Sequence, residues 1–194
     1  MRKSKKERKT LETEVTIDLN IDGTGKREIN TPIKFFTHML EQVAAHGGFD
    51  LKIDVKSHDL DNHHVIEDVA LTLGDAFKEA LADKKGINRY GSFMLPMDES
   101  LSLAVVDLSG RAFSKCDVQV KDEKTSDFET VLLPHFFNSF AQASASTIHI
   151  KLLDGTDTHH IIEAVFKSFA RALSIACSIN ENKKDVIPST KGIL

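Results

Sequence analysis

Two stretches of this chain nearly repeat each other, and this repetition constrains the fold more than any other feature. The sequence reads HHVIEDVALTLGDAF from His63 and HHIIEAVFKSFARAL from His159, ninety-six residues later. A further histidine precedes each pair at a similar distance, His38 in the first case and His135 in the second. Agreement in order, length and polar positions indicates an internal duplication. The sequence therefore predicts two halves of similar structure.

Hydrophobic periodicity assigns the same order of elements to the two halves, residues 10–92 and residues 93–181. In the first half, VTIDLNIDGTG alternates apolar and polar residues, which indicates a strand that enters a hairpin. FFTHMLEQVAAHGG has helical spacing before two glycines, FDLKIDVK alternates again, and residues 65–82 return to helical spacing. In the second half we predict the strands ESLSLAVVDLS and AFSKCDVQV, the helix FETVLLPHFFNSFAQAS, the strand TIHIKLL and the helix HHIIEAVFKSFARALSIA. Strand, strand, helix, strand, helix in each half predicts an α+β fold with helices packed on sheets.

Composition and the chain ends exclude several classes of protein. The first nine residues, MRKSKKERK, are basic without apolar periodicity, which predicts a flexible, solvated tail. A net charge of -4 and a pI near 6.1 argue against nucleic acid or an anionic membrane as a partner. No apolar run approaches the ~20 residues of a membrane span. Cys116 and Cys177 are far apart, as is typical of reduced thiols, so we expect a cytoplasmic protein.

The repeated motif has the spacing of a metal site. Residues three and four apart share a helix face, so Glu67 can share a face with His63 or with His64, but hardly with both. The remaining histidine of the pair must point elsewhere. In a duplicated protein its natural target is a second metal that the other repeat also serves.

Eight candidate ligands follow from the two repeats. They are His38, His63, His64, Glu67, His135, His159, His160 and Glu163. Six imidazoles and two carboxylates divide into two sites of three imidazoles and one carboxylate each. Such a nitrogen-rich set suits manganese, iron or zinc and is poor for calcium or magnesium. His149 and His46 are alternatives to His135 and His38, but they break the symmetry of the repeats.

Nine ordered motifs identify a family that the chain resembles along nearly its whole length. They are TLET, DGTG, FFTHML, HGGFDL, HHVIED, PMDESL, VDLSGR, HHIIEAVFK and STKG, and they resemble the imidazoleglycerol-phosphate dehydratases of histidine biosynthesis. The resemblance implies a fold of the ribosomal S5 second-domain type, with helices between two four-stranded sheets. It also implies a homo-oligomer in which trimers assemble into a 24-subunit particle. Two manganese ions per active site, with ligands from neighbouring subunits, complete the expectation.

The reaction that the resemblance implies is the loss of water from D-erythro-imidazole glycerol phosphate to give imidazole acetol phosphate. The hydrogen that is removed lies on a carbon without an adjacent carbonyl, so the reaction needs another electron sink. An imidazolate ring that bridges two metal ions can serve, through a diazafulvene-like intermediate. Two ring nitrogens would then explain two metals and two copies of the motif.

The resemblance also implies roles for individual residues. Glu12 in TLET matches a family acid near the side chain of the substrate, and Asp98 and Glu99 in PMDES are further candidates for acid–base catalysis. The residues expected to bind the substrate are Glu12, His38, His64, Arg89, Arg111, Lys167, Ser189 and Lys191. Lys167 also has support from geometry, because it follows Glu163 by four residues and shares its helix face. Residues 182–194 are expected to close over the phosphate group.

Five positions depart from the family pattern. The family commonly has Asp at Thr37, TGxGF where this chain has TPIKF with Pro32 and Lys34, Asp at Asn62, and Asn at Asp157. All eight proposed ligands are present. These departures concern the loop before the first helix and the residues that orient the ligands.

Two other functions compete with a dehydratase. A dinuclear metallohydrolase, such as a phosphatase, uses a metal-bound hydroxide, but such sites are usually richer in aspartate. A metal-binding assembly protein shares the ligand prediction, although it needs no phosphate pocket, so its basic residues would be dispersed. Ligands drawn from different chains would make metal a condition of assembly in either case.

Overall fold

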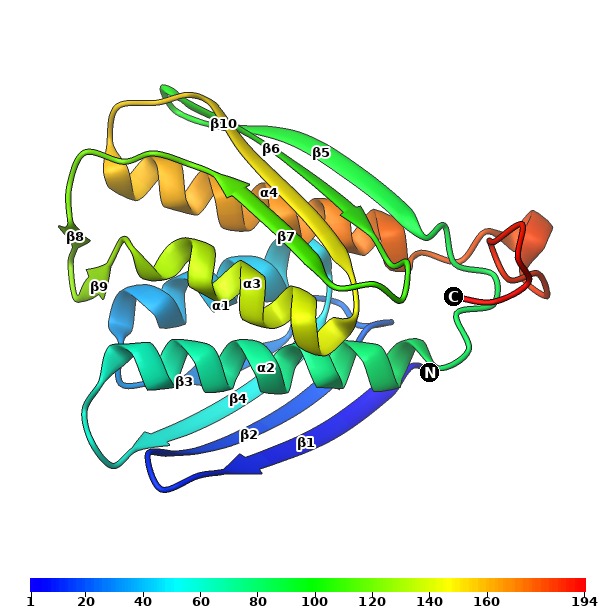
Figure 1. The fold of residues 1–194 in the computed structure, drawn as a ribbon, viewed down its shortest axis with the longest axis horizontal. Helices are drawn as coiled ribbons and strands as arrows, with labels where there is room; N and C mark the ends of the chain where they lie inside the picture. The colour runs from blue at the N-terminus through cyan, green and yellow to red at the C-terminus, as the bar shows by residue number, and fades with distance from the viewer.

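A computed structural model describes residues 1–194, which form two four-stranded sheets with four helices between them (Figure 1). The first sheet has the order β1-β2-β4-β3, and the second has the order β5-β6-β10-β7. The strands of the first sheet are β1 (Lys3–Lys9), β2 (Thr13–Asn20), β3 (Arg27–Asn30) and β4 (Asp50–Ser57); those of the second are β5 (Tyr90–Met97), β6 (Ser100–Asp107), β7 (Phe113–Asp117) and β10 (Thr147–Asp154). The helices are α1 (Lys34–Gly47), α2 (Asn62–Leu81), α3 (Leu132–Ser144) and α4 (Thr158–Cys177). A short hairpin, β8 (Lys124–Thr125) with β9 (Phe128–Glu129), and the 3-10 helix η1 (Glu181–Lys183) complete the elements.

The two sheets have the same connectivity, which confirms the predicted duplication. In each sheet the first two strands are antiparallel, the last strand in sequence is antiparallel to the second, and the third strand is parallel to the last. Each half therefore contributes three strands to its four-stranded sheet before its first helix, one more than the periodicity predicted. The additional strands are β1 and β5.

The prediction of a solvated tail at residues 1–9 was wrong, because β1 pairs with β2 along its whole length. Its inward side chains are polar, so the strand has no apolar alternation. Lys6 forms an ion pair with Glu79, and Arg8 Nε lies 2.5 Å from Asp68 Oδ1, both acids of α2. Lysine-rich edge strands of this kind also resist pairing with other chains.

Strand β5 lacks an apolar pattern for a different reason. It crosses α4 so closely that a Cβ atom at Gly91 would lie 1.9 Å from the carbonyl oxygen of Ala172. A glycine is therefore required there, and it interrupts the alternation that would have marked the strand.

The hairpin predicted at DGTG was also wrong, because β4 lies between β2 and β3. Asp50 at the start of β4 holds the connection by accepting the N–H groups of Thr24, at 2.8 Å, and Lys26, at 3.1 Å, and the amide of Asn20. These hydrogen bonds lower the pKa of Asp50 to about 2.

The helices pair across the duplication. Helix α2 of the first half packs against α3 of the second, and α1 of the first half packs against α4 of the second (Figure 1). Tilted and edge-to-face ring contacts join α3 to α4 in the core, made by Phe136, Phe137, Phe140, Phe166 and Phe169. The two halves therefore share one hydrophobic core. None of the helices is both long and apolar enough to cross a membrane.

Candidate metal centres

Both histidine pairs begin a helix that an aspartate caps. Asp61 is the N-cap residue of α2 and accepts the N–H of His63, at 2.8 Å. Asp157 is the N-cap residue of α4 and accepts the N–H of His160, at 3.0 Å. These caps satisfy free N–H groups at each helix start. They fix the first turn, and with it the directions of the two adjacent histidines.

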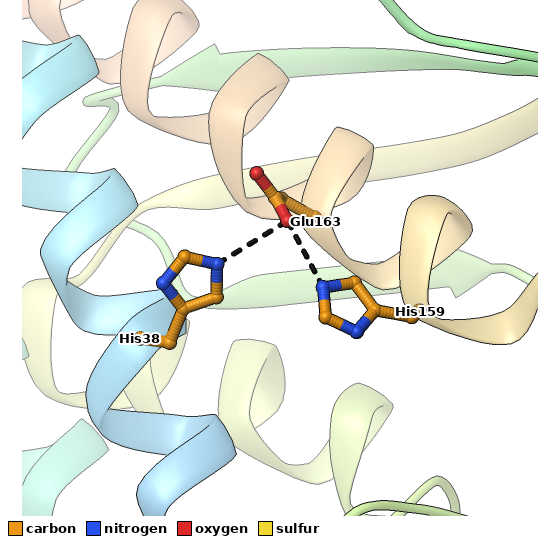
Figure 2. A group of neighbouring side chains, drawn as sticks. All are labelled: His38, His159 and Glu163. Atoms are coloured by element: carbon orange, nitrogen blue, oxygen red, sulfur yellow. Dashed lines mark hydrogen bonds and ion pairs between the residues drawn. The ribbon is translucent and has the colours of Figure 1, made fainter.

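The first cluster joins His159 and Glu163 of α4 to His38 of α1. In Figure 2 both rings point to the same glutamate oxygen: Nε2 of His159 lies 3.1 Å and Nε2 of His38 3.3 Å from Glu163 Oε2. Lys167 Nζ lies 2.6 Å from the other oxygen, as its spacing predicts. Burial by itself raises the pKa of Glu163, but the hydrogen bonds from Lys167 and His38 outweigh it, so the pKa lies below its usual value.

The second cluster joins His63 and Glu67 of α2 to His135 of α3. Nε2 of His63 lies 3.7 Å and Nε2 of His135 3.8 Å from Glu67 Oε2, and the two imidazole centroids are 4.2 Å apart. Nε2 of His135 is buried and has no hydrogen-bond partner. A buried nitrogen without a partner is costly, and a metal ion beside His63 and Glu67 would satisfy it.

Each cluster therefore takes one histidine of a tandem pair and the glutamate that follows it from one half, and its third residue from the other. His38 belongs to the first half and reaches the pair of the second, whereas His135 does the reverse. The reason is the helix pairing, in which α1 packs on α4 and α3 packs on α2. Each cluster holds two imidazoles and one carboxylate in a single chain, one imidazole fewer than the sequence predicts for each site.

The second histidine of the first pair, His64, points away from both clusters. Its Nδ1 lies 2.6 Å from Asp59 Oδ2, and its Nε2 lies 3.5 Å from Glu12 Oε1. The hydrogen bond to Asp59 raises the pKa of His64 and fixes the ring. A carboxylate on Nδ1 leaves Nε2 as the nitrogen that can face a metal or a substrate.

His160 repeats this arrangement in the second half. Its Nδ1 lies 2.8 Å from Glu99 Oε2, and its Nε2 lies 3.8 Å from Asp98 Oδ2. The hydrogen bond to Glu99 raises the pKa of His160. Glu12 and Asp98 thus occupy equivalent places beside the outward histidines.

A buried carboxylate that the sequence analysis missed anchors the TLET segment. Asp68 of α2 accepts the hydroxyl of Thr13, at 2.5 Å, and that of Thr10, at 3.4 Å. The Thr10 hydroxyl in turn accepts the N–H groups of Glu12, at 3.1 Å, and Thr13, at 3.0 Å. This chain of bonds places the Glu12 backbone beside α2. The signal in the sequence was a carboxylate on the apolar side of an amphipathic helix.

Most of the basic residues that we expected to bind the phosphate lie at the opposite end of the molecule from the two clusters. The Arg89 guanidinium binds Asp107, at 2.7 and 3.1 Å, and donates to the Pro188 carbonyl, at 3.0 Å. The Arg89 N–H donates to the carbonyl of Ala176, the penultimate residue of α4. His159 is seventeen residues earlier in that helix, which corresponds to about 25 Å along its axis.

The C-terminal segment lies at the Arg89 end as well (Figure 1). Asn180 N–H donates to the Gly86 carbonyl at 2.7 Å, and Gly86 N–H donates to that of Val186 at 3.0 Å. Ser189 is partly buried and Lys191 is exposed in this segment. Arg111 is also exposed, and its N–H donates to the Ser109 hydroxyl, at 3.2 Å. Among the expected phosphate ligands, only Lys167 lies beside a cluster in the same chain.

Two further observations concern a cavity at the second cluster and the position of His149. A cavity of about 510 Å³ opens beside His63, and Asn62, Glu129 and Val131 line it. His149 lies instead on the outer face of the second sheet, next to the ring of Phe113 at 5.4 Å. The structure thus brings His135, and not His149, to the pair of α2.

Comparisons with known proteins agree with this architecture. A profile of the family described as imidazoleglycerol-phosphate dehydratase matches residues 31–173. The imidazoleglycerol-phosphate dehydratase of Koribacter versatilis is 47% identical over 195 residues, which cover 100% of each chain. The histidine biosynthesis bifunctional protein HisB of Spirosoma linguale is 47% identical over 189 residues, 97% of this chain and 49% of that protein. The crystal structure of IGPD from Pyrococcus furiosus in complex with (S)-C348 superposes with a TM-score of 0.85 at 35% identity, covering 97% of this chain and 100% of that one. This chain belongs to the imidazoleglycerol-phosphate dehydratase family.

Proposed function

We propose that the protein is the dehydratase that converts D-erythro-imidazole glycerol phosphate to imidazole acetol phosphate and water in histidine biosynthesis. Family membership over the full chain supports the reaction class. The observation that carries the proposal furthest is the pair of clusters, each with two imidazole Nε2 atoms directed at one glutamate. Two matched sites for one cation each suit a substrate whose imidazole ring has two nitrogens.

The donor set fits two manganese ions per active site. His38, His159 and Glu163 would hold one ion, and His63, Glu67 and His135 the other. Imidazole nitrogens with one carboxylate suit manganese, iron or zinc, and the unpartnered Nε2 of His135 supports a cation at the second cluster. When bound, the two ions would lower the proton affinity of the substrate ring and stabilise negative charge on it.

The remaining chemistry requires proton transfer by the side chains of the chain. Elimination removes a hydroxyl group from one carbon and a proton from the next, so the departing hydroxyl needs a proton and the carbon needs a base. Glu12 is suited to this task because the Thr10–Asp68 network fixes its backbone and its carboxylate is half exposed beside His64. Once the enol has formed, its tautomerisation gives the ketone.

Asp98 and Glu99 differ in how well they suit acid–base catalysis. Glu99 accepts the N–H of Asp157 and bonds with His160, and it also accepts the N–H of Thr156. These bonds hold the pKa of Glu99 far below its usual value and suit it to orient His160. Asp98 is exposed and remains a candidate beside Glu12.

A complete site requires more than one chain. Arg89 and the segment with Ser189 and Lys191 lie at the far end of α4 from His159, at a distance of about 25 Å. A substrate much shorter than this distance contacts both groups only if different subunits supply them. We therefore include in the proposal a homo-oligomer, with trimers assembling into a 24-subunit particle, in which neighbouring subunits provide Arg89, Arg111, Ser189, Lys191 and the outward His64 and His160.

The outer face of the second sheet is the surface that we assign to contact between subunits. Met94, Val105 and Phe113 are exposed on it, with exposed fractions of 54%, 38% and 53%. Several exposed apolar side chains on one sheet face favour an interface there. The cytoplasm as the compartment rests on two well-separated free cysteines and is part of the same proposal.

The test is conversion of imidazole glycerol phosphate by metal-stripped protein, with and without added manganese, with particle size measured in the same samples. Turnover and a large particle that both require manganese would support the proposal. A manganese-dependent particle without turnover would contradict the dehydratase and favour a metal-binding assembly protein. Release of inorganic phosphate from the substrate would favour a hydrolase.

A further inference from the structure

A short hairpin, residues 122–130, has no counterpart in the first half of the molecule. In the first half only three residues separate β3 from α1. In the second half fourteen residues separate β7 from α3, and they contain the paired strands β8 and β9. The contacts of this hairpin are with the starts of three helices that carry the metal-centre histidines.

The hairpin caps α1 through Asp127. The Asp127 carboxylate accepts the N–H of Lys34, at 2.7 Å, and that of Phe35, at 2.9 Å. The N-cap residue of α1 itself, Ile33, has no side-chain acceptor. Free N–H groups at a helix start need an acceptor, and here a residue of the other half supplies it. His38 follows one turn later on the same helix.

The hairpin also holds α2. The amide of Asn62 donates to Glu129 Oε2, at 2.8 Å, and to the Asp127 carbonyl, at 3.2 Å. Asn62 is the first residue of α2 and directly precedes His63. The bond from Asn62 lowers the pKa of Glu129, which keeps its carboxylate charged as an acceptor.

The third contact is with α4. The hydroxyl of Thr158 donates to Asp122 Oδ2, at 2.6 Å, and Thr158 is the first residue of α4, directly before His159. The buried ring of Phe128 packs against Phe35, with centroids 5.6 Å apart. Phe35 in turn meets the His159 imidazole edge to face, at 5.0 Å.

We propose that the 122–130 hairpin sets the positions of both metal clusters, with Asp127 as the positioning residue for His38 and Asn62 as the positioning residue for His63. The inference rests on the proposed manganese centre. Asp127 caps the start of α1, Asp122 accepts the hydroxyl group at the start of α4, and Asn62 ties the start of α2 to the same hairpin. The two clusters lie on different helix pairs, and the hairpin contacts a helix of each pair.

The test uses manganese affinity at one cluster at a time, measured by the electron paramagnetic resonance signal of free Mn²⁺. Glu67→Gln leaves the His38 cluster to be measured, and Glu163→Gln leaves the His63 cluster. Asp127→Ala is expected to weaken manganese binding about tenfold or more in the Glu67→Gln background, as loss of orienting residues does. In the Glu163→Gln background it is expected to have no more than a threefold effect.

Asn62→Ala is expected to do the reverse. It should weaken manganese binding in the Glu163→Gln background and change it little in the Glu67→Gln background. Asp127→Asn retains a capping oxygen, so its affinity is expected to stay close to that of the parent. Asp83→Ala is the control. Asp83 also accepts a backbone N–H, that of Lys85, but it lies beyond the C-terminal end of α2, far from the hairpin. Circular dichroism of each metal-free variant reports whether it folds.

Equal losses at both clusters, or none, would overturn the positioning role, and so would a loss with Asp127→Asn as large as with Asp127→Ala. If the unsubstituted protein binds no manganese, the metal centre and the positioning role are both overturned. If it binds two ions and the hairpin variants bind them equally well, only the positioning role fails.

Discussion

The two halves of the molecule have the same strand order, but the outer face of the first sheet is polar at positions where that of the second is apolar. In β2 the outward positions hold Glu14, Thr16 and Asp18, and Glu14 pairs with Lys9 at 2.5 Å. At the corresponding places in β6 the chain has Leu101, Leu103 and Val105. The inner faces of both strands are buried, with Val15, Ile17 and Leu19 on β2, and Ala104 and Val106 beside the bonded Ser102 on β6. The difference teaches that the outer positions respond to what lies outside the subunit: water at the first sheet and, in our proposal, another subunit at the second.

A comparison of the two clusters gives the largest expected effect. Glu163→Gln and Glu67→Gln each remove the carboxylate of one cluster, and each is expected to lower kcat by more than about 10³-fold, because a metal ion supplies several kcal/mol at the transition state. Steady-state kinetics with manganese in excess provide the measurement. A loss confined to one variant would show that only one half of the duplication is catalytic.

The acids beside the outward histidines provide the next comparison. Glu12→Gln is expected to lower kcat by about 10²–10⁴-fold, the contribution of a positioned acid or base. Asp98→Asn is expected to lower it by less than about tenfold, because Asp98 is exposed and makes no hydrogen bond through its side chain. Turnover of both variants at saturating substrate decides between the two acids. Equal losses would contradict the assignment of Glu12 alone.

The outer faces themselves can be tested by placing the same charge on each. Leu103→Asp puts a carboxylate on the second sheet, opposite Lys151 of β10, and burial of these charges between subunits would cost on the order of several kcal/mol. Thr16→Asp, at the corresponding place on the first sheet, is expected to leave the particle unchanged. Light scattering after gel filtration measures the mass of both. A large particle formed by Leu103→Asp would show that this face is not the contact.

The smallest expected effect concerns the connections that leave β2 and β6. Asp50 accepts N–H groups in the first half, whereas the Ser109 hydroxyl accepts the N–H of Arg111 in the second. The folded pKa of Asp50, about 2, is depressed from 3.8, so its stabilisation is present above pH 4 and is lost as the pH falls toward 2. Asp50→Asn is expected to cost under about 1 kcal/mol above pH 4, because water reaches the partly exposed carboxylate and screens its charge.

Urea unfolding at pH 7 and at pH 2.5 checks this expectation. The cost of Asp50→Asn should shrink at the lower pH, whereas Ser109→Ala should cost the same at both, because a hydroxyl does not titrate in this range. A pH-independent cost for Asp50→Asn would mean that its amide replaces the carboxylate fully.

Local spacing was sufficient for much of the site. The tandem histidines and the glutamates that follow them predicted one shared face per helix, and the structure shows His159 with Glu163 and His63 with Glu67 on such faces. The two strands without apolar alternation were not predictable in this way. Strand β1 uses Lys6 and Arg8 to bond with α2, and β5 needs Gly91 for close contact with α4.

The sequence by itself determined the duplication, the amphipathic helices and which eight side chains are candidate metal donors, because each depends on residues within a few turns or on comparison of one stretch with another. Only the tertiary structure decided that His38 joins the pair of α4 and His135 the pair of α2. It also decided that Asp68 anchors Glu12 and that Asp127 caps a helix of the other half. The physical reason is that an apolar helix face does not specify its partner in the sequence: the packing of four helices between two sheets selects it, and the polar contacts between distant segments follow from that packing.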